Sequence, residues 1–218
     1  MGDLTSDDDF RATTFVVIDF ESTTPVGHRP EPIDVATIQL RVRDGQLVET
    51  GRFSALIRPP EHAPITRFDT EQTGITPQMV AHQPLAVDVL ATLDAGLGQP
   101  PYLLVAHHAP TEAGILHDYR DSCPRLADTD FLDTVRLARG AYPDLPSHRL
   151  DVLMIHLQIP RPINRHRALP DTTITAQLFT RLLTDGARTH RWGTLRQLRQ
   201  IGGYRARASL PRQEALFD

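Results

Sequence analysis

The stretch TTFVVIDFE, residues 13–21, decides the fold class of this chain. Its β-branched and aromatic side chains are apolar on both faces, which is typical of a central strand covered on both sides. Asp19 and Glu21 end the run, and residues two apart on a strand point to the same face. Such a pair of acids is costly unless a cation accompanies it, and a divalent metal ion is the natural partner. The alternative is a strand end that emerges into solvent.

The rest of the chain reads as strands and helices built around this strand. Asp44-Gly45 between two strand-like runs predicts a hairpin, and Thr76-Pro77 is typical of a helix N-cap and first helical residue. The further strands are expected at residues 33–42, 47–59, 102–106 and the start of 131–140. The helices are expected after Pro77, at 84–97, after Pro110, at the end of 131–140, at 148–159 and at 171–186. Gly140 is expected to end the helix in 131–140.

These elements predict an α/β fold, a mixed five-stranded sheet flanked by helices, over residues 13–186. In the last helix Ile174, Leu178 and Leu182 recur at i, i+4 and i+8, which predicts a core-facing stripe. Asp185-Gly186 is expected to stop this helix.

Both ends of the chain are expected to lie outside this domain. Residues 1–12 are acidic and lack apolar periodicity, which predicts disorder. Residues 187–218 form a basic extension, in which 202–211 reads as a flexible linker. Seven Arg and no acid lie between residues 187 and 212, so this segment either touches phosphates or is simply solvated.

Composition and charge narrow the class of protein. The chain has 218 residues, of which 40% are hydrophobic and 23% charged, as in ordinary globular proteins. A net charge of −4 argues against a globally basic nucleic-acid coat. The absence of a membrane-length apolar run and the acidic start argue against a membrane protein and a secretory signal. The single cysteine, Cys123, fits a reducing cytoplasm.

A second acidic region follows the strand at 102–106. In LVAHHAPTEAGIL, residues 104–116, Pro110 suits a first helical turn and places Glu112 within it. Glu112 is therefore a candidate site acid, or it only complements the helix dipole, at about 0.3–1 kcal/mol. Asp118 lies about 240° further round the helix, so the two acids cannot face one site.

A third region is HRALPD, residues 166–171. Pro170 favours a helix start near that point, which puts Asp171 in the first turn. Asp171 precedes Ile174 by three residues and shares its inward face, and His166 lies on the loop just before. The alternative is a surface histidine and an ordinary N-terminal helix acid.

Together the three regions read D-x-E, A-H-H-A-x-x-E and H-x-x-x-x-D. With TGITPQMV, FLDTVRLAR and SHRLDVL as further landmarks, residues 13–186 resemble the DEDDh branch of the DnaQ-like 3′–5′ exonuclease family, which has a ribonuclease H-like fold. The resemblance implies two divalent metal ions, Mg²⁺ or Mn²⁺, held by four acids, and a histidine as general base for the attacking water. By position these are Asp19, Glu21, Glu112, Asp171 and His166.

The resemblance also implies a set of substrate-binding residues around the terminal nucleotide. Met79 is a candidate wedge against the terminal base, with helix packing as the alternative, and His108 stands where Asn is common in the family. The family's second motif usually carries Asp where Glu112 stands, and the longer arm shifts the carboxylate by up to ~1.5 Å. We expect an active enzyme with an altered metal preference. The implied substrate-binding set is Phe20, Ser22, Thr23, Thr24, Met79 and His108.

The segment QEALF, residues 213–217, resembles the short Q-x-x-L-F peptide by which many bacterial replication and repair proteins bind the sliding clamp. In such a peptide Leu216 and Phe217 are apolar anchors and Gln213 fixes the orientation. The alternative is that Leu216 and Phe217 pack on their own domain.

The function expected from these features is a stand-alone metal-dependent exonuclease. It would remove nucleotides from single-stranded or frayed DNA 3′ ends in proofreading, repair or end trimming. An exoribonuclease is the alternative within the class, since the two differ in tolerance of the 2′-hydroxyl. A catalytically impaired clamp- or DNA-binding adaptor is the alternative from another class.

Overall fold

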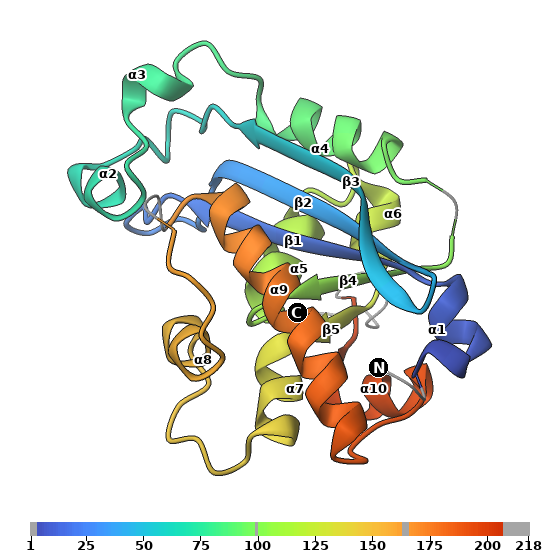
Figure 1. The fold of residues 1–218 in the computed structure, drawn as a ribbon. Coiled ribbons are helices and arrows are strands. Elements are labelled where there is room, and N and C mark those ends of the chain that lie inside the picture. Colours follow the sequence, from blue (N-terminus) through green and yellow to red (C-terminus); the bar gives the residue numbers. More distant parts are fainter. Residues whose placement is uncertain (1–3, 99, 163–165, 207–218) are drawn as a thin grey trace, which may run out of the picture.

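The computed structural model describes residues 4–98, 100–162 and 166–206 (Figure 1). Its strands are β1 (Thr14–Ser22), β2 (Pro32–Arg43), β3 (Gln46–Leu56), β4 (Tyr102–Ala106), β5 (Phe131–Asp133) and β6 (Gly203–Tyr204). Its α-helices, after a short 3₁₀ turn η1 (Leu4–Ser6), are α1 (Asp8–Ala12), α2 (Arg67–Thr73), α3 (Pro77–Val80), α4 (Ala86–Ala95), α5 (Pro110–Asp118), α6 (Pro124–Ala127), α7 (Thr134–Ala141), α8 (Leu150–His156), α9 (Ala168–Arg188) and α10 (Leu195–Gly202).

The described strands form one mixed sheet in the order β3-β2-β1-β4-β5-β6. β1 pairs antiparallel with β2 and parallel with β4, so it is a central strand, as the apolar run predicts. The predicted β2–β3 hairpin is confirmed: Asp44 and Gly45 have φ of 51° and 73°, the left-handed pair that a two-residue hairpin turn needs. The α/β class is confirmed, but the expected five strands are wrong, because β6 adds a sixth in the described part.

Alternating side chains of β1 face two separate cores. Phe15 and Val17 pack in the cluster that includes the apolar stripe of α9, whereas Val16, Ile18 and Phe20 pack with α4, α5 and α6. Figure 1 shows α9 crossing one face of the sheet, with α4 and α6 on the other side. The strand is therefore apolar on both faces because helices cover both.

Proline marks the predicted helix starts. Pro77 begins α3, where the Thr76 hydroxyl caps the amide of Met79, and Pro110 begins α5. α9 begins at Ala168, so that Pro170 lies in its first turn. Proline fits these positions because the first helical amides have no acceptor within the helix.

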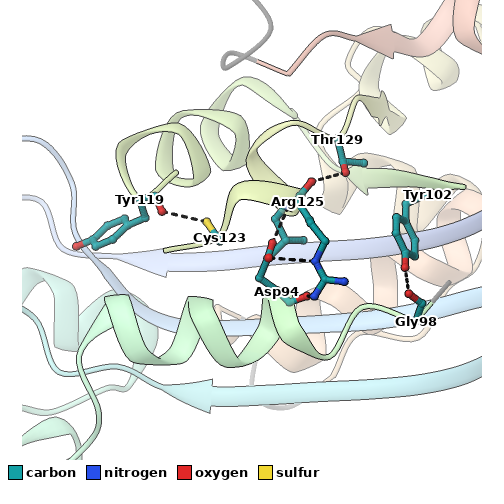
Figure 2. Close-up of polar contacts among 8 residues, drawn as sticks. Asp94, Gly98, Tyr102, Tyr119, Cys123, Arg125 and Thr129 are labelled. Carbon is teal, nitrogen blue, oxygen red and sulfur yellow. Dashed lines mark hydrogen bonds and ion pairs between the residues drawn. The ribbon is translucent and has the colours of Figure 1, made fainter. Parts of the chain in front are cut away.

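A buried carboxylate joins α4 to α6 on the face of the sheet opposite α9 (Figure 2). Asp94 Oδ2 accepts from Arg125 Nε at 3.2 Å and its Oδ1 accepts from the Leu126 amide at 2.8 Å. Nearby, the buried Cys123 thiol donates to the Tyr119 carbonyl at 3.3 Å. Burial, and then the charge of Asp94, raise the pKa of Cys123 to about 12. This cysteine is therefore a packing residue with an unreactive thiol.

The prediction that residues 1–12 are disordered is wrong for residues 4–12. Leu4 and Phe10 are fully buried in the cluster beneath α9. Asp7 caps α1 by accepting from the Asp9 and Phe10 amides, and its second oxygen accepts from the Leu195 amide at 2.6 Å. The acids that suggested a solvated tail thus include one that joins the first turn of α1 to the start of α10.

The domain also continues beyond its predicted end at residue 186. α9 runs through Asp185-Gly186 to Arg188, and the ring of Trp192 lies against Gly186. Trp192 and Leu198 of the following segment are buried in the same core, and part of the predicted linker, Gly203–Tyr204, pairs with β5 as β6. Residues 207–218 lie outside the described residues. No helix in the described ranges has the length and hydropathy that crossing a membrane would demand.

We expect Gly186→Ala to destabilise the protein. A β-carbon at this position would lie 2.0 Å from Cζ2 of Trp192, so the ring must move, at about 1–3 kcal/mol for such overpacking. Urea unfolding followed by tryptophan fluorescence measures the loss. Gly98→Ala is the matched control, since its β-carbon would meet nothing within 4 Å. Equal unfolding midpoints for the two variants would contradict the packing of residues 187–206 on α9.

Candidate active site

The site begins where the alternation along β1 changes from apolar to acidic residues. Asp19 and Glu21 are odd-numbered, like Phe15 and Val17, so they lie on the face of β1 that packs against α9. Both are partly exposed. Glu21 lies opposite Asp34 of β2 in the strand register. The carboxylates therefore point to the same side of the sheet as the first turn of α9.

α9 brings the third predicted region to this strand end. One ligand atom each of Glu21, His166 and Asp171 lie within 4.8 Å of one another, and Asp171 is only 7% exposed. Two oxygen ligands on opposite sides of one divalent ion lie about 4.0–5.2 Å apart. The spacing and the oxygen and imidazole donors of this group therefore fit a divalent metal ion. Within the described ranges, Asp19 and Glu112 do not join this group of three.

A partly buried ion pair fixes the backbone next to His166. Arg167 Nε donates to Asp34 Oδ2 at 2.9 Å, and the Ala168 amide donates to the same oxygen at 3.3 Å. Asp34 is the register partner of Glu21, so this contact fastens the start of α9 beside the acids of β1. His166 itself has a φ of 63°, a left-handed conformation that costs a non-glycine residue about 1–3 kcal/mol and is common at functional sites.

Glu112 lies buried beside these groups. It is 4% exposed, and its Oε2 accepts no hydrogen bond from any residue that the structure describes. Burial, with the charges of Asp133 and Glu21 nearby, raises the pKa of Glu112 to about 8. A helix-start acid that only complements the dipole would face solvent. A buried carboxylate oxygen that is left without a donor, close to other carboxylates, fits a metal ligand.

The turn before α5 is held by a residue that sequence reasoning missed. Asp133 Oδ1 accepts from the His108 amide at 3.2 Å and from the Val135 amide at 2.8 Å, while His107 Nδ1 lies 2.9 Å from Thr134 Oγ1. His108 is held with a φ of 78°. The signal for Asp133 was present, since an acid between a strand and a helix is a good N-cap. Asp34 was missed too, although an acid at the start of an apolar strand is unusual.

Four of the predicted substrate-binding residues line one cavity of about 410 Å³. Its opposite wall is formed by α5, including Pro110 and Asp118. Sequence reasoning also missed the buried Asp69, which holds the wall that carries Thr24. Its Oδ1 accepts from the amide and hydroxyl of Thr24 at 3.1 and 2.7 Å. The T-x-x-D pattern of a capping box, Thr66 to Asp69, was its sequence signal. The four are Phe20, Ser22, Thr23 and Thr24.

The other predicted binding residues lie elsewhere. His108 lines a separate cavity against α7 and the segment before α8. Met79 is 36% exposed on α3, and it is not among the described residues that line the cavity of Thr24. Gln213, Leu216 and Phe217 lie outside the described residues.

Several known proteins are similar to this chain in sequence or in fold. The chain is 32% identical over 176 residues to the DNA polymerase III PolC-type protein of Bacillus subtilis (strain 168), covering 80% of this chain and 12% of that protein. It is 32% identical over 194 residues to the 3′-5′ exonuclease DinG of the same strain, covering 86% and 19%. The solved structure of exonuclease X in complex with 5′ overhanging duplex DNA matches with a TM-score of 0.62 at 27% identity, covering 86% of this chain and 98% of that chain.

The chain thus spans less than a fifth of the length of either Bacillus subtilis relative, whereas it matches nearly the whole of the solved structure. A family model described as Exonuclease (RNase_T) matches residues 16–179, which run from β1 into α9 and include the three acidic regions. With its ribonuclease H-like fold, the chain belongs to this exonuclease family.

Proposed function

We propose that this chain is a divalent-metal-dependent 3′–5′ exonuclease that hydrolyses DNA from its 3′ ends. The observation that carries the proposal is the convergence of Glu21, His166 and Asp171 from β1 and the start of α9, within 4.8 Å. Residues 150 positions apart in sequence meet there with donor types suited to a metal ion. Exonuclease family membership supports the reaction class. The similarity to exonuclease X, which was solved in complex with DNA, supports DNA as the substrate.

Four carboxylates would hold two ions, Mg²⁺ or Mn²⁺. Glu21 and Asp171 lie together, Asp19 shares the face of Glu21, and Glu112 offers its Oε2 from the first turn of α5. Oxygen donors of this kind are those that Mg²⁺ and Mn²⁺ prefer. When bound, two such ions stabilise the charge on the attacking and leaving oxygens of an in-line phosphodiester displacement.

His166 would act as the general base. An imidazole can accept a proton near neutral pH. His166 lies beside Glu21 and Asp171, the carboxylates that would hold the metal ions. Arg167 and Asp34 keep the adjoining backbone in place, which limits the motion of the ring relative to Glu21. The proton of the attacking water would pass to this ring while the water oxygen bonds to phosphorus and the bond from phosphorus to the preceding nucleotide's 3′-oxygen breaks. A proton would then return to that 3′-oxygen, so that a nucleoside 5′-monophosphate leaves.

The cavity of about 410 Å³ would receive the 3′-terminal nucleotide. Phe20 offers an apolar surface, and the Ser22 hydroxyl accepts or donates no hydrogen bond to any described residue, so it is available to the ligand. Asp69 fixes the amide and hydroxyl of Thr24 at the wall. We keep Met79 and His108 as proposed contacts beyond this cavity, Met79 against the terminal base.

Digestion of matched oligonucleotides tests the proposed function. With Mg²⁺ or Mn²⁺, a 5′-labelled DNA strand should shorten stepwise from its 3′ end. Asp19→Asn and Glu21→Gln should each lower the rate by about 10²-fold or more, because a misplaced metal ion costs that much. Asp44→Asn, in the distant β2–β3 hairpin, is the control with the same chemical change.

The same assay separates the alternatives. If neither DNA nor RNA is shortened in the presence of metal, the chain is instead a catalytically impaired adaptor. Faster shortening of an RNA of the same sequence would replace the DNA proposal by an exoribonuclease. Shortening from the 5′ end would contradict the polarity.

A second prediction follows from the raised pKa of Glu112. Because the folded protein holds this proton more tightly than the unfolded chain, the free energy of unfolding falls as pH rises from the ordinary value of 4.5 to about 8. Glu112→Gln removes the charge and keeps the shape. We expect it to raise the stability of the metal-free protein at pH 8 by roughly 2–4 kcal/mol, and to lower cleavage.

Thermal unfolding at pH 6 and pH 8, with and without Mn²⁺, measures these effects. Metal should stabilise the wild type more at pH 8, because the ion needs a deprotonated carboxylate, and should stabilise the Gln variant less. Glu112→Asp tests whether the longer arm is needed, and Asp118→Asn on the same helix is the control. A Gln variant as active as the wild type, with unchanged stability at pH 8, would make Glu112 an ordinary helix-start acid.

We further propose that residues 213–217 bind a bacterial sliding clamp. The support is the Q-x-x-L-F pattern, with Leu216 and Phe217 as apolar anchors. Tethering would raise the local concentration of the enzyme at primer ends without strong DNA affinity in an acidic domain.

Surface plasmon resonance on an immobilised bacterial clamp tests the segment. Replacing Gln213, Leu216 and Phe217 by Ala should abolish retention and leave cleavage of free oligonucleotides unchanged, since none of the three belongs to the proposed active site. Replacement of Arg212 by Ala serves as the control. Retention equal to the wild type would exclude this peptide as the contact.

A further inference from the structure

A second cavity, of about 760 Å³, lies between the turn after β4, α7 and the segment that leads to α8. Its size falls within the range of about 300–1,000 Å³ that is usual for ligand sites. Its walls include His107 and His108 from the turn, Arg139 from α7, and His148 and Arg149 from the segment before α8. We call it the α7–α8 cavity.

The charges of this cavity are the opposite of those at the active site. None of the eleven described residues that line it is acidic, whereas two are Arg and three are His. The whole chain carries a net charge of −4. The Arg139 and Arg149 guanidinium groups are exposed and form no ion pair or hydrogen bond with any residue that the structure describes. Both are therefore available to an anion.

Hydrogen bonds hold the rest of the wall in place. His148 Nε2 donates to the Tyr142 carbonyl at 2.9 Å, since a carbonyl oxygen only accepts. His107 Nδ1 contacts the Thr134 hydroxyl, and the His108 amide is fixed by Asp133. The described wall is therefore held by hydrogen bonds, and the charged groups that it leaves unpaired are the two guanidinium groups.

A short stretch of chain, from His108 to Glu112, joins the wall of the α7–α8 cavity to the candidate active site. His108 precedes Glu112 by four residues, and the Asp133 carboxylate that accepts from the His108 amide also raises the pKa of Glu112 through its charge. The cavity wall that carries His108 is therefore fixed to the turn that leads to Glu112.

We propose that the α7–α8 cavity binds the phosphodiester backbone of the nucleotides upstream of the 3′-terminal one, through Arg139 and Arg149. This inference rests on the proposed exonuclease function and adds the path of the substrate strand. A guanidinium offers a planar pair of donors that matches phosphate oxygens. An acidic protein needs such a local cationic groove to hold a polyanion, and grooves of this kind hold about 4–16 nucleotides of single strand.

The test compares substrates of different length on the Arg139→Ala/Arg149→Ala double variant. For a single strand of about 12 nucleotides, KM should rise at least about tenfold, and the slope of log KM against log salt should fall by about 1.4 for two lost phosphate contacts. The kcat value should hold. Hydrolysis of thymidine 5′-(4-nitrophenyl phosphate), which has no upstream nucleotides, should be unchanged and so reports an intact fold and site.

Arg41→Ala/Arg43→Ala is the matched control, because it removes the same charge from the far end of β2. If the cavity variant raises KM no more than this control and keeps the salt slope, the inference is wrong. Arg139→Gln/Arg149→Gln provides a second variant if the alanine pair does not fold. Anisotropy of the labelled strand in Ca²⁺ measures binding without cleavage, so loss of binding in the cavity variant supports the inference even if the proposed reaction fails.

Discussion

The alternation of side chains along β1 is the constraint on which the rest of the structure depends. β1 pairs on both edges, with β2 and β4, so its side chains can only project to the two faces of the sheet. The apolar residues of one face pack against α9, and those of the other face pack against α4 and α5. Where the strand ends, the same alternation places Asp19 and Glu21 on the face that packs against α9. The rigid core thus sets the direction of the acids.

Holding these acids together opposes stability, and other contacts offset that cost. Glu112 is buried near Glu21 and Asp133, and its pKa rises accordingly. Neighbouring polar groups compensate: Asp34 pairs with Arg167 beside His166, and Asp133 caps α7 while it fixes the turn before α5. A region of repelling carboxylates is therefore surrounded by satisfied hydrogen bonds, which favour one arrangement of the site.

Charge is also divided in space. The carboxylates face the strand end, while Arg139 and Arg149 face the adjoining cavity. The net charge of −4 describes neither region. A nucleic-acid strand carries negative charge along its whole length, so an acidic centre that uses metal ions works best with a cationic surface next to it. Under the proposed function, this separation would let one small domain attract the polymer and still concentrate divalent ions.

Local patterns alone determined the class of fold, most elements and the identity of the acidic regions, because strand alternation, proline at helix starts and the Asp44-Gly45 turn act over a few residues. They failed for residues 4–12, for the end of α9 and for β6, whose order comes from tertiary contacts such as Asp7 with Leu195 and β6 with β5. Only the tertiary structure decided that Glu21 and Asp171 meet beside His166. It also decided that Asp34 fixes the start of α9, that Asp133 fixes the turn before α5, and that two arginines line one cavity. The physical reason is that burial and charge interactions depend on distance in space, which spacing along the chain does not encode.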